Sequence, residues 1–383
     1  MSPSDEAFQE LARIFSTRKN RVLEIELLPP GLGPLLQDEC SIGITKKYLV
    51  QAFVTARRTF FENCTNTLCD FASAAAGDDI DSIVQEYSSN RLGYLLVSTE
   101  IILLFDCEHL TACNWRKRFL EARKKRHGLV LNEQEPFIPA LDAELTLMTT
   151  YLCSPLPRHT KSPTLWQHRL WVLHELLQVG GLEAAFMHPQ TGRPVGQNFQ
   201  SKGAGYNLRN AACLLTSELA IVLRAGELHP RNYYAFSYMR QIFELLRKNL
   251  EETFDVALLA EPMINTVLDW CLAHPSDISG WMFQLHLLKT VQKSDLHVRA
   301  VDKVICYALD IGWEGESLWT FVDLSVRGFD LRDTLSHKLQ VFPRTPITEL
   351  AALDGGIPPS PWKTWLTLAK AYWTDGQQEC KDI

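Results

Sequence analysis

Hydrophobic side chains recur at intervals of three and four residues along most of this chain. One such row comprises Tyr48, Phe53, Ala56 and Phe60. This spacing places apolar side chains on one face of an α-helix. Strictly alternating patterns long enough for a strand are scarce, so the sequence predicts an all-α fold. Two further rows with the helical spacing are Leu141, Leu145 and Met148, and Leu165, Leu170, Leu173 and Leu177.

Glycine and proline interrupt the helical pattern in three places, at residues 29–34, 180–205 and 354–361. Such clusters are typical of loops. The second is long enough to be an insertion or a mobile loop. We therefore expect an N-terminal extension over residues 1–40 and a helical-repeat region over 41–350 that carries the insertion. A C-terminal helix and tail are expected over 351–383.

A short motif recurs along the chain, in which a polar turn precedes a large ring that opens an apolar helix. The intervals between the rings are 51, 70, 45 and 38 residues, and the last approaches the roughly 34-residue period of a helical hairpin repeat. The excess in the first two is explained by insertions near 121–140 and 180–205. We expect these rings to fill the core between neighbouring repeats. They are Trp115, Trp166, Phe236, Trp281 and Trp319.

Second helices are predicted between the motifs, for example over 143–151 and 211–224. Each repeat is then a pair of helices. Stacked pairs of this kind predict an alpha-alpha superhelix, a right-handed solenoid of helical hairpins with a concave face.

Charge narrows the classes of partner. The chain has 383 residues, of which 22% are charged, and a net charge of −7. An acidic balance disfavours binding of nucleic acid by the whole chain. The basic stretch 116–126 is either a solvated helix end or a phosphate site.

The ten cysteines contain no Cys-x-x-Cys pair, and no metal site is predicted. There is no apolar run of 18 or more residues, and the N-terminus is polar and acidic, so we expect neither a signal peptide nor stable membrane insertion. A cytoplasmic protein with reduced thiols is the resulting expectation. The last four residues match a prenylation box poorly, because Lys381 and Asp382 stand where aliphatic residues are required.

The recurring motif resembles the repeat of protein prenyltransferase alpha subunits, which has the form Asn/Pro-x-x-Tyr-x-x-Trp-x-x-Arg. The best copy, residues 164–173, contains Trp166 and Arg169. The third copy keeps Asn232 and Tyr233 but has Met239 where arginine is usual. The later copies depart further from the pattern.

A finer resemblance is to the alpha-subunit repeat-containing branch of this family, which includes the alpha-like subunit of type 3 geranylgeranyltransferase. Three segments carry it, at residues 24–29, 46–49 and 161–163. The likeness extends over about residues 24–325.

The resemblance implies a role in prenyl transfer, which moves an isoprenoid from its diphosphate to a cysteine thiolate. The reaction needs a metal-activated sulfur, an apolar pocket and positive charge on the leaving diphosphate. In this family a beta subunit supplies the zinc and the lipid pocket, and the alpha subunit wraps around it. The chain is thus expected to be the non-zinc subunit of a heterodimeric protein geranylgeranyltransferase, inactive alone and without a cofactor of its own.

The same resemblance implies the partners. They are a beta subunit like that of the Rab-type geranylgeranyltransferase, geranylgeranyl diphosphate as substrate, and protein substrates with C-terminal cysteines.

Two residues are carried over from the family as catalytic candidates, Lys161 and Tyr233. Lys161 would stabilise the leaving diphosphate, and Tyr233 would lie near it. The alternatives are an exposed turn lysine and a packing ring. The family often has tyrosine where this chain has Pro163.

Five further residues are candidates for contact with the diphosphate or the partner. For the last three, the alternative is a structural role, in which they bond turn carbonyls or carboxylates of the next repeat. The five are Asn232, Tyr234, His168, Arg169 and Arg118.

Because the later copies depart from the motif, a second hypothesis stays open. On this hypothesis the chain is a non-catalytic helical-repeat scaffold or adaptor that has lost prenylation.

Overall fold

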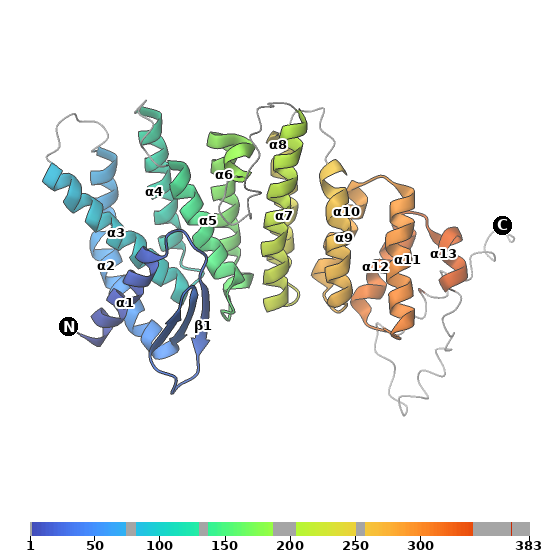
Figure 1. Ribbon diagram of the computed structural model, residues 1–383, viewed down its shortest axis with the longest axis horizontal. Helices are drawn as coiled ribbons and strands as arrows, with labels where there is room; N and C mark the ends of the chain where they lie inside the picture. The colour runs from blue at the N-terminus through green and yellow to red at the C-terminus, as the bar shows by residue number, and fades with distance from the viewer. Residues whose placement is uncertain are drawn as a thin grey trace, which may run out of the picture. The chain divides into compact units, whose positions relative to one another are not determined.

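The computed structural model describes residues 2–73, 82–129, 137–186, 204–249 and 257–339, together with Ala369. Thirteen α-helices dominate these residues, accompanied by one small sheet (Figure 1). The chain divides into two compact units, unit 1 from Met1 to Glu251 and unit 2 from Glu252 to Ile383. The predicted all-α helical-repeat fold is confirmed for the described part.

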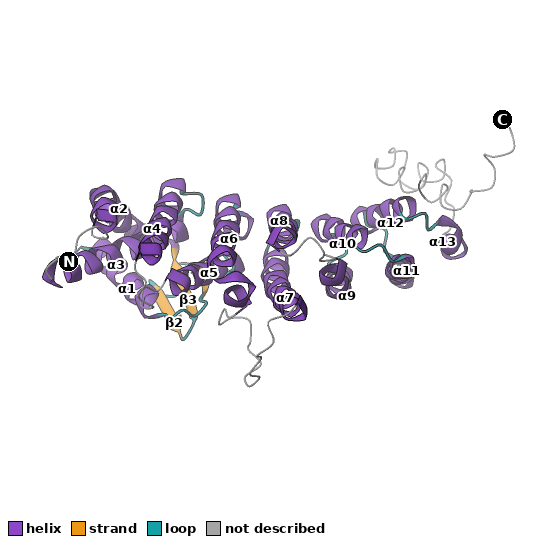
Figure 2. Ribbon diagram, turned by 90° about the horizontal axis from the view of Figure 1, so that it is seen from above, coloured by secondary structure: helices purple, strands orange, loops and turns teal. Residues whose placement is uncertain are grey.

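The described part of unit 1 holds eight helices. They are α1 (Pro3–Thr17), α2 (Lys46–Ser73), α3 (Ser82–Phe105), α4 (Leu110–Leu129), α5 (Phe137–Cys153), α6 (Pro163–Phe186), α7 (Ala204–Leu228) and α8 (Tyr233–Asn249). Helices α2, α4, α6 and α8 lie side by side in one layer, and α3, α5 and α7 form the layer behind it (Figure 2). Each helix of the first layer packs against a helix of the second, which makes the helix pair the repeating element.

The predicted second helices at 143–151 and 211–224 are found as α5 and α7, both longer than expected. The first-layer helix predicted near Tyr48 begins at Lys46. Most of the 180–205 insertion lies outside the described residues, as does the C-terminal region 351–383 apart from Ala369. The domain boundaries at 40 and 350 stay predictions.

A three-stranded sheet near the N-terminus is an addition that the sequence analysis did not predict. Its strands are β1 (Glu24–Leu28), β2 (Leu35–Asp38) and β3 (Ser41–Thr45), in the order β1-β3-β2. The central strand β3 pairs in parallel with β1 and antiparallel with β2. Its buried Ile42 and Ile44 flank Gly43, where a Cβ atom would come within 2.7 Å of Leu28. The strands are four or five residues long, too short for the alternation to stand out in the sequence.

Hydroxyl groups of α5 attach the start of the sheet to the helices. The N–H groups of Leu23 and Ile25 donate to Thr150 Oγ1 at 3.1 Å and to Ser154 Oγ at 2.9 Å. These buried bonds satisfy N–H groups at the start of β1, which is an edge strand of the sheet in the described part of the chain. The sheet and α1 lie within unit 1.

Unit 2 is a second set of helices with its own core. They are α9 (Ala257–Ala273), α10 (Ile278–Thr290), α11 (Ser294–Asp310), α12 (Glu316–Gly328) and α13 (Arg332–Leu339). Helix α10 packs closely on α9, because Gly280 leaves room for the Trp270 ring, which a Cβ atom would meet at 2.5 Å. Among the described residues, none of the helices has the length and apolar character needed to cross a bilayer.

Candidate functional site

Three of the first-layer helices of unit 1, α4, α6 and α8, begin with equivalent caps. His109 Nδ1 accepts the N–H of Ala112 at 3.1 Å, and Ser162 Oγ accepts that of Leu165 at 3.1 Å. In α8, Asn232 Oδ1 accepts the N–H of the residue three positions on at 3.2 Å. Side-chain acceptors at this position satisfy N–H groups that have no partner inside the helix. The caps fix which residues are equivalent from one repeat to the next.

The caps correct the predicted register of the first repeat. Counted from His109, the position of Trp166 is taken by Cys113, and that of Arg169 by Arg116. Trp115, chosen in the sequence analysis as the first ring, is two positions further along. It is buried but packs differently, with its ring stacked on Phe119 at 5.9 Å.

The indole groups of the three other motif tryptophans show which positions of the repeats are equivalent. Trp166, Trp281 and Trp319 each donate from Nε1 to the carbonyl oxygen six residues earlier, at 2.8, 2.9 and 2.7 Å. Trp115 instead donates to the carbonyl of Cys64 at 3.3 Å. All five predicted rings, Phe236 included, are buried. The ring plus its indole bond is thus the repeated structural feature in three of the five copies.

Arg169 joins two repeats through a buried ion pair. Its guanidinium donates to both carboxylate oxygens of Glu218 on α7, at 2.7 and 2.8 Å, and to the Leu145 carbonyl and Thr149 hydroxyl of α5, both at 2.9 Å. Tyr238 of α8 donates to the same carboxylate at 2.6 Å. Burial by itself lowers the pKa of Arg169, but Glu218 more than offsets this and holds it above its usual range.

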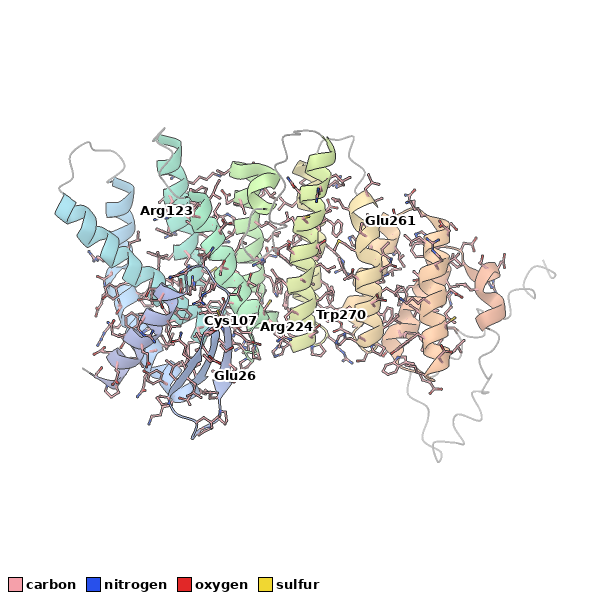
Figure 3. All side chains as sticks on the ribbon, viewed as in Figure 1. Glu26, Cys107, Arg123, Arg224, Glu261 and Trp270 are labelled. Carbon is pink, nitrogen blue, oxygen red and sulfur yellow. The ribbon has the colours of Figure 1, made fainter. Side chains whose placement is uncertain are left out.

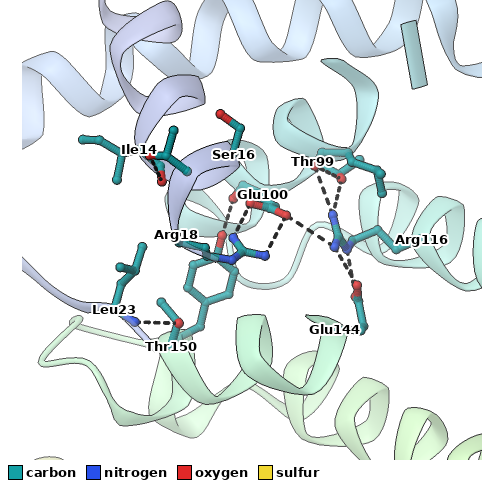
Figure 4. A network of polar contacts seen from close by, with 12 residues as sticks. Ile14, Ser16, Arg18, Leu23, Thr99, Glu100, Arg116, Glu144 and Thr150 are labelled. Carbon is teal, nitrogen blue, oxygen red and sulfur yellow. Dashed lines mark hydrogen bonds and ion pairs between the residues drawn. The ribbon is translucent and has the colours of Figure 1, made fainter. Parts of the chain in front are cut away.

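Arg116 makes the matching set of bonds one repeat earlier, as Figure 4 shows. It donates to both oxygens of Glu144 on α5 at 2.6 and 2.8 Å, and to the Leu96 carbonyl and Thr99 hydroxyl of α3 at 3.0 and 2.8 Å. Arg116 is buried, whereas Arg118, the residue predicted for this place, is exposed.

The buried charges of unit 1 continue toward the N-terminus. Arg18, just after α1, pairs with both oxygens of Glu100 at 2.6 and 3.2 Å, and Glu100 lies 3.6 Å from Arg116 (Figure 4). At the other end His168 Nε2 lies 2.6 Å from Glu144. A chain of alternating positive and negative side chains therefore links α1, α3, α4, α5 and α6.

Three of the five candidates for contact with the diphosphate or the partner are wrong, because their side chains are buried. Asn232 and His168 are fully buried and Arg169 is 2% exposed. The polar groups described above are engaged within unit 1, so none of these side chains can reach a ligand at the surface. The structural alternative holds for His168 and Arg169.

Asn232 has a positioning role inside the fold. Its Nδ2 donates to the carbonyl of Thr160 at 2.6 Å, an oxygen that also accepts from the Trp166 indole. The Thr160 hydroxyl lies 2.7 Å from His229 Nδ1. These bonds connect the 3-10 turn His159–Lys161 to the segment between α7 and α8.

Lys161 and Tyr233 are exposed at this junction. Lys161 Nζ donates to the carbonyl of Pro230 at 2.8 Å, which places the ammonium beside the first turn of α8. Tyr233 and Tyr234, at the start of that helix, are 59% and 49% exposed. Two further exposed arginines, which the sequence did not single out, lie just before the 3-10 turn and just before α8. They are Arg158 and Arg231. We call this set, Arg158, Lys161, Arg231, Tyr233 and Tyr234, the cationic edge.

The starts of the first-layer helices lie at one end of unit 1, where the second-layer helix α7 ends (Figure 3). Cys107, just before α4, and Arg224, near the end of α7, lie toward the sheet end, whereas Arg123 lies at the opposite end of α4 (Figure 3). Among the described residues no group of three or more histidine, cysteine or acidic side chains could hold a metal ion. The cationic edge therefore offers positive charge and phenol groups but no described metal ligands.

The acidic partners of the arginines were missed in the sequence analysis. Glu100, Glu144 and Glu218 each stand in a mainly apolar stretch of a second-layer helix. A lone carboxylate in such a stretch requires a buried partner. A single glutamate within an apolar helical stretch is therefore the sequence signal that could have identified these three carboxylates.

The model of the protein prenyltransferase alpha subunit repeat matches residues 215–246, which span the end of α7 and most of α8. This match contains the cap Asn232 and the exposed Tyr233 and Tyr234.

Curated proteins similar to this chain carry the same repeat in their names. The chain is 27% identical over 195 residues to protein prenyltransferase alpha subunit repeat-containing protein 1 of Danio rerio, covering 51% of this chain and 38% of that protein. It is 30% identical over 138 residues to the Homo sapiens protein of that name, covering 36% and 29%. It is 25% identical over 254 residues to protein 1-B of Xenopus laevis, covering 64% and 49%.

The alignments span less than half the length of each of these relatives. The repeat match falls on helices whose caps, buried rings and ion pairs recur along unit 1. The chain is a helical protein that contains the protein prenyltransferase alpha subunit repeat.

Proposed function

We propose that this chain is the non-zinc, alpha-type subunit of a heterodimeric protein geranylgeranyltransferase. The observation that carries the proposal is the cationic edge, where Lys161 and Tyr233 of neighbouring repeats are both exposed and are connected through Pro230 and Asn232. The resemblance to family alpha subunits singles out the same two positions.

The chemistry of the edge suits a leaving diphosphate. Negative charge grows on the diphosphate as its bond to the isoprenoid breaks, and fixed cations lower the energy of that transition state. Lys161, Arg158 and Arg231 supply the charge, and the exposed phenols of Tyr233 and Tyr234 can donate hydrogen bonds. The buried bonds of Asn232 and Trp166 to Thr160 hold the turn, so the cations need little reorganisation.

The remaining parts of the reaction are assigned to a partner. The zinc that activates the cysteine and the pocket for the lipid would belong to a beta subunit like that of the Rab-type geranylgeranyltransferase. The substrates would be geranylgeranyl diphosphate and proteins with C-terminal cysteines.

The test is co-expression with such a beta subunit and assay of the purified complex. We expect a 1:1 complex that transfers a C20 group to a cysteine-ended protein, and no transfer by this chain alone. Lys161→Ala should lower kcat by at least about tenfold, and Tyr233→Phe by less, since a point charge is worth more than one hydrogen bond to the transition state. Lys125→Ala, an exposed lysine on α4, is the matched control. Failure to co-purify with a beta subunit would rule the proposal out.

A second candidate function is a non-catalytic scaffold that has kept the repeats and lost prenylation. It is favoured by the bond of Lys161 to the Pro230 carbonyl, which already gives that ammonium a structural partner. Met239 in place of arginine in the third copy agrees with it. On this alternative neither the unmodified chain nor the Lys161→Ala variant would support transfer of the lipid in the assay with a beta subunit.

A further inference from the structure

Helix α2 carries a row of apolar and basic side chains on its outer face. Its members recur at alternating intervals of three and four residues, so they follow one face of the helix. The apolar members are well exposed, Val50 at 37%, Val54 at 54% and Phe61 at 46%. Polar residues are the rule at such positions of a surface helix. The row, called here the α2 seam, is Lys47, Val50, Val54, Arg57 and Phe61.

The opposite face of α2 already forms the core of unit 1. Leu49, Ala52, Ala56 and Phe60 are at most 4% exposed. The helix therefore has two apolar faces, and the described residues of unit 1 cover only one of them.

Neighbouring side chains widen the seam on the side of α3 and α4. Phe105, at the end of α3, is 38% exposed and stacks on Phe53 with ring centroids 4.1 Å apart. Leu110, at the start of α4, is 62% exposed and follows His109, whose ring lies 6.3 Å from Phe61. Clustered apolar side chains of this kind mark interaction surfaces.

The charge beside the seam is positive although the chain is acidic. Residues 46–64 contain two lysines and two arginines against one acid, Glu62, while the whole chain carries −7. The guanidinium of Arg57 lies over the Phe61 ring at 5.0 Å, and Arg58 is paired with Asp5 at 3.0 Å. Lys46 and Lys47 are exposed at the start of the helix.

We propose that the α2 seam binds an amphipathic helix of a partner protein that carries Asp and Glu beside its apolar row. Alternating intervals of three and four residues are the spacing by which two helices pack along a common seam. The lysines and Arg57 would pair with the acids that flank the partner's apolar row.

A second copy of this chain fits the seam poorly. A symmetric pair would bring the same surface of both copies together, so that Lys47 and Arg57 would face like charges. The inference is independent of the proposed prenyltransferase role, because the seam shares no residue with the cationic edge.

Fluorescence anisotropy of labelled helical peptides with the full chain tests the proposal. The probe has three heptads, with leucine at the seam positions and glutamate at the flanking positions. Its counterpart has lysine at the same flanks. We expect saturable binding of the glutamate peptide, weakened at high salt, and binding of the lysine peptide that is at least about tenfold weaker.

Two variants connect the binding to the seam. Val54→Glu should weaken binding of the glutamate peptide by at least about tenfold, because it places a charge in the middle of the apolar row. Arg57→Glu should reverse the preference between the peptides. Leu324→Glu on α12, a residue that is 39% exposed, is the control and should bind as the unmodified chain does. Both seam side chains lie at the surface, and circular dichroism checks that the variants stay folded.

Several results would overturn the proposal. They are absence of saturable binding, equal affinity for both peptides, and equal affinity of the Val54→Glu and Leu324→Glu variants. A further contradicting result can come from sedimentation velocity. If the chain forms a dimer and Val54→Glu dissociates it, a second copy of the chain occupies the seam. A geranylgeranyl-transfer assay that fails would leave these outcomes unaffected.

Discussion

His168 owes its protonation state to its neighbours. It is fully buried, and burial by itself lowers the pKa of a histidine. The adjacent Cys113 thiol and the Glu144 carboxylate more than offset this and raise its pKa to about 9. The imidazole is therefore a cation at neutral pH, the last positive group in the chain of charges that starts at Arg18.

Stability should accordingly depend on the protonation of His168. An unfolded histidine has a pKa of about 6.5, so the folded state binds this proton more tightly. The resulting stabilisation is fully present below about pH 6.5 and is lost as the pH rises toward 9. Urea unfolding at several pH values should show a fall in the free energy of unfolding over this window, and a much smaller fall for His168→Gln. Parallel curves for the two proteins would contradict the assignment of the charge.

Paired helices are the elements of this fold, and ion pairs across them fix their register. Arg116 and Arg169 each bind one carbonyl, one hydroxyl and one carboxylate, drawn from two successive second-layer helices. The same pattern in two repeats shows that the arginine is a connector between helix pairs. Met239, fully buried, occupies the corresponding position of the third copy.

Breaking one such connector should be costly. Arg169→Met leaves the Glu218 carboxylate buried without its main partner, and we expect a loss of about 3–5 kcal/mol in the free energy of unfolding. The double variant Arg169→Met with Glu218→Leu removes both charges and should recover most of that loss. Lys303→Met, which breaks an exposed pair with Asp269, should cost less than about 1 kcal/mol. Urea denaturation measures all three, and a double variant no more stable than Arg169→Met would refute the connector role.

At the scale of the whole molecule, the chain consists of two compact units, and each contains a buried cysteine. Cys107 in unit 1 and Cys271 in unit 2 are 4% and 0% exposed. Burial raises the pKa of both thiols, so at neutral pH neither forms a reactive thiolate in the folded state. Each thiol can thus report when its own unit opens.

Thiol labelling across a urea series should separate the two units. We expect neither Cys107 nor Cys271 to react with a maleimide in buffer, and each to react once its unit unfolds. Arg169→Met should shift the labelling of Cys107 to lower urea and move that of Cys271 less, because the broken contacts all lie in unit 1. Peptide mapping by mass spectrometry reads the two sites separately. Equal shifts at both sites would mean that the two units unfold as one.

The local chemistry of the sequence determined the helical class, the helix pairs and most of the repeated rings. Apolar spacing, capping residues and turn prolines act over a few residues, and they are visible without a structure. The structure places Lys161 in an exposed turn, which is compatible with both interpretations of this residue. Tyr233 is 59% exposed, which disfavours its alternative as a packing ring.

Tertiary structure alone decided the register of the first repeat, the partners of the buried charges and the attachment of the small sheet. The cap His109 and the ion pair of Arg116 with Glu144 show that Cys113, and not Trp115, occupies the position of the repeat ring in the first copy. Only folding brings together carboxylates and guanidinium groups that are far apart in sequence, and the burial of each depends on that encounter. The sequence contains the residues of such contacts, but their pairing is a property of how the helices pack.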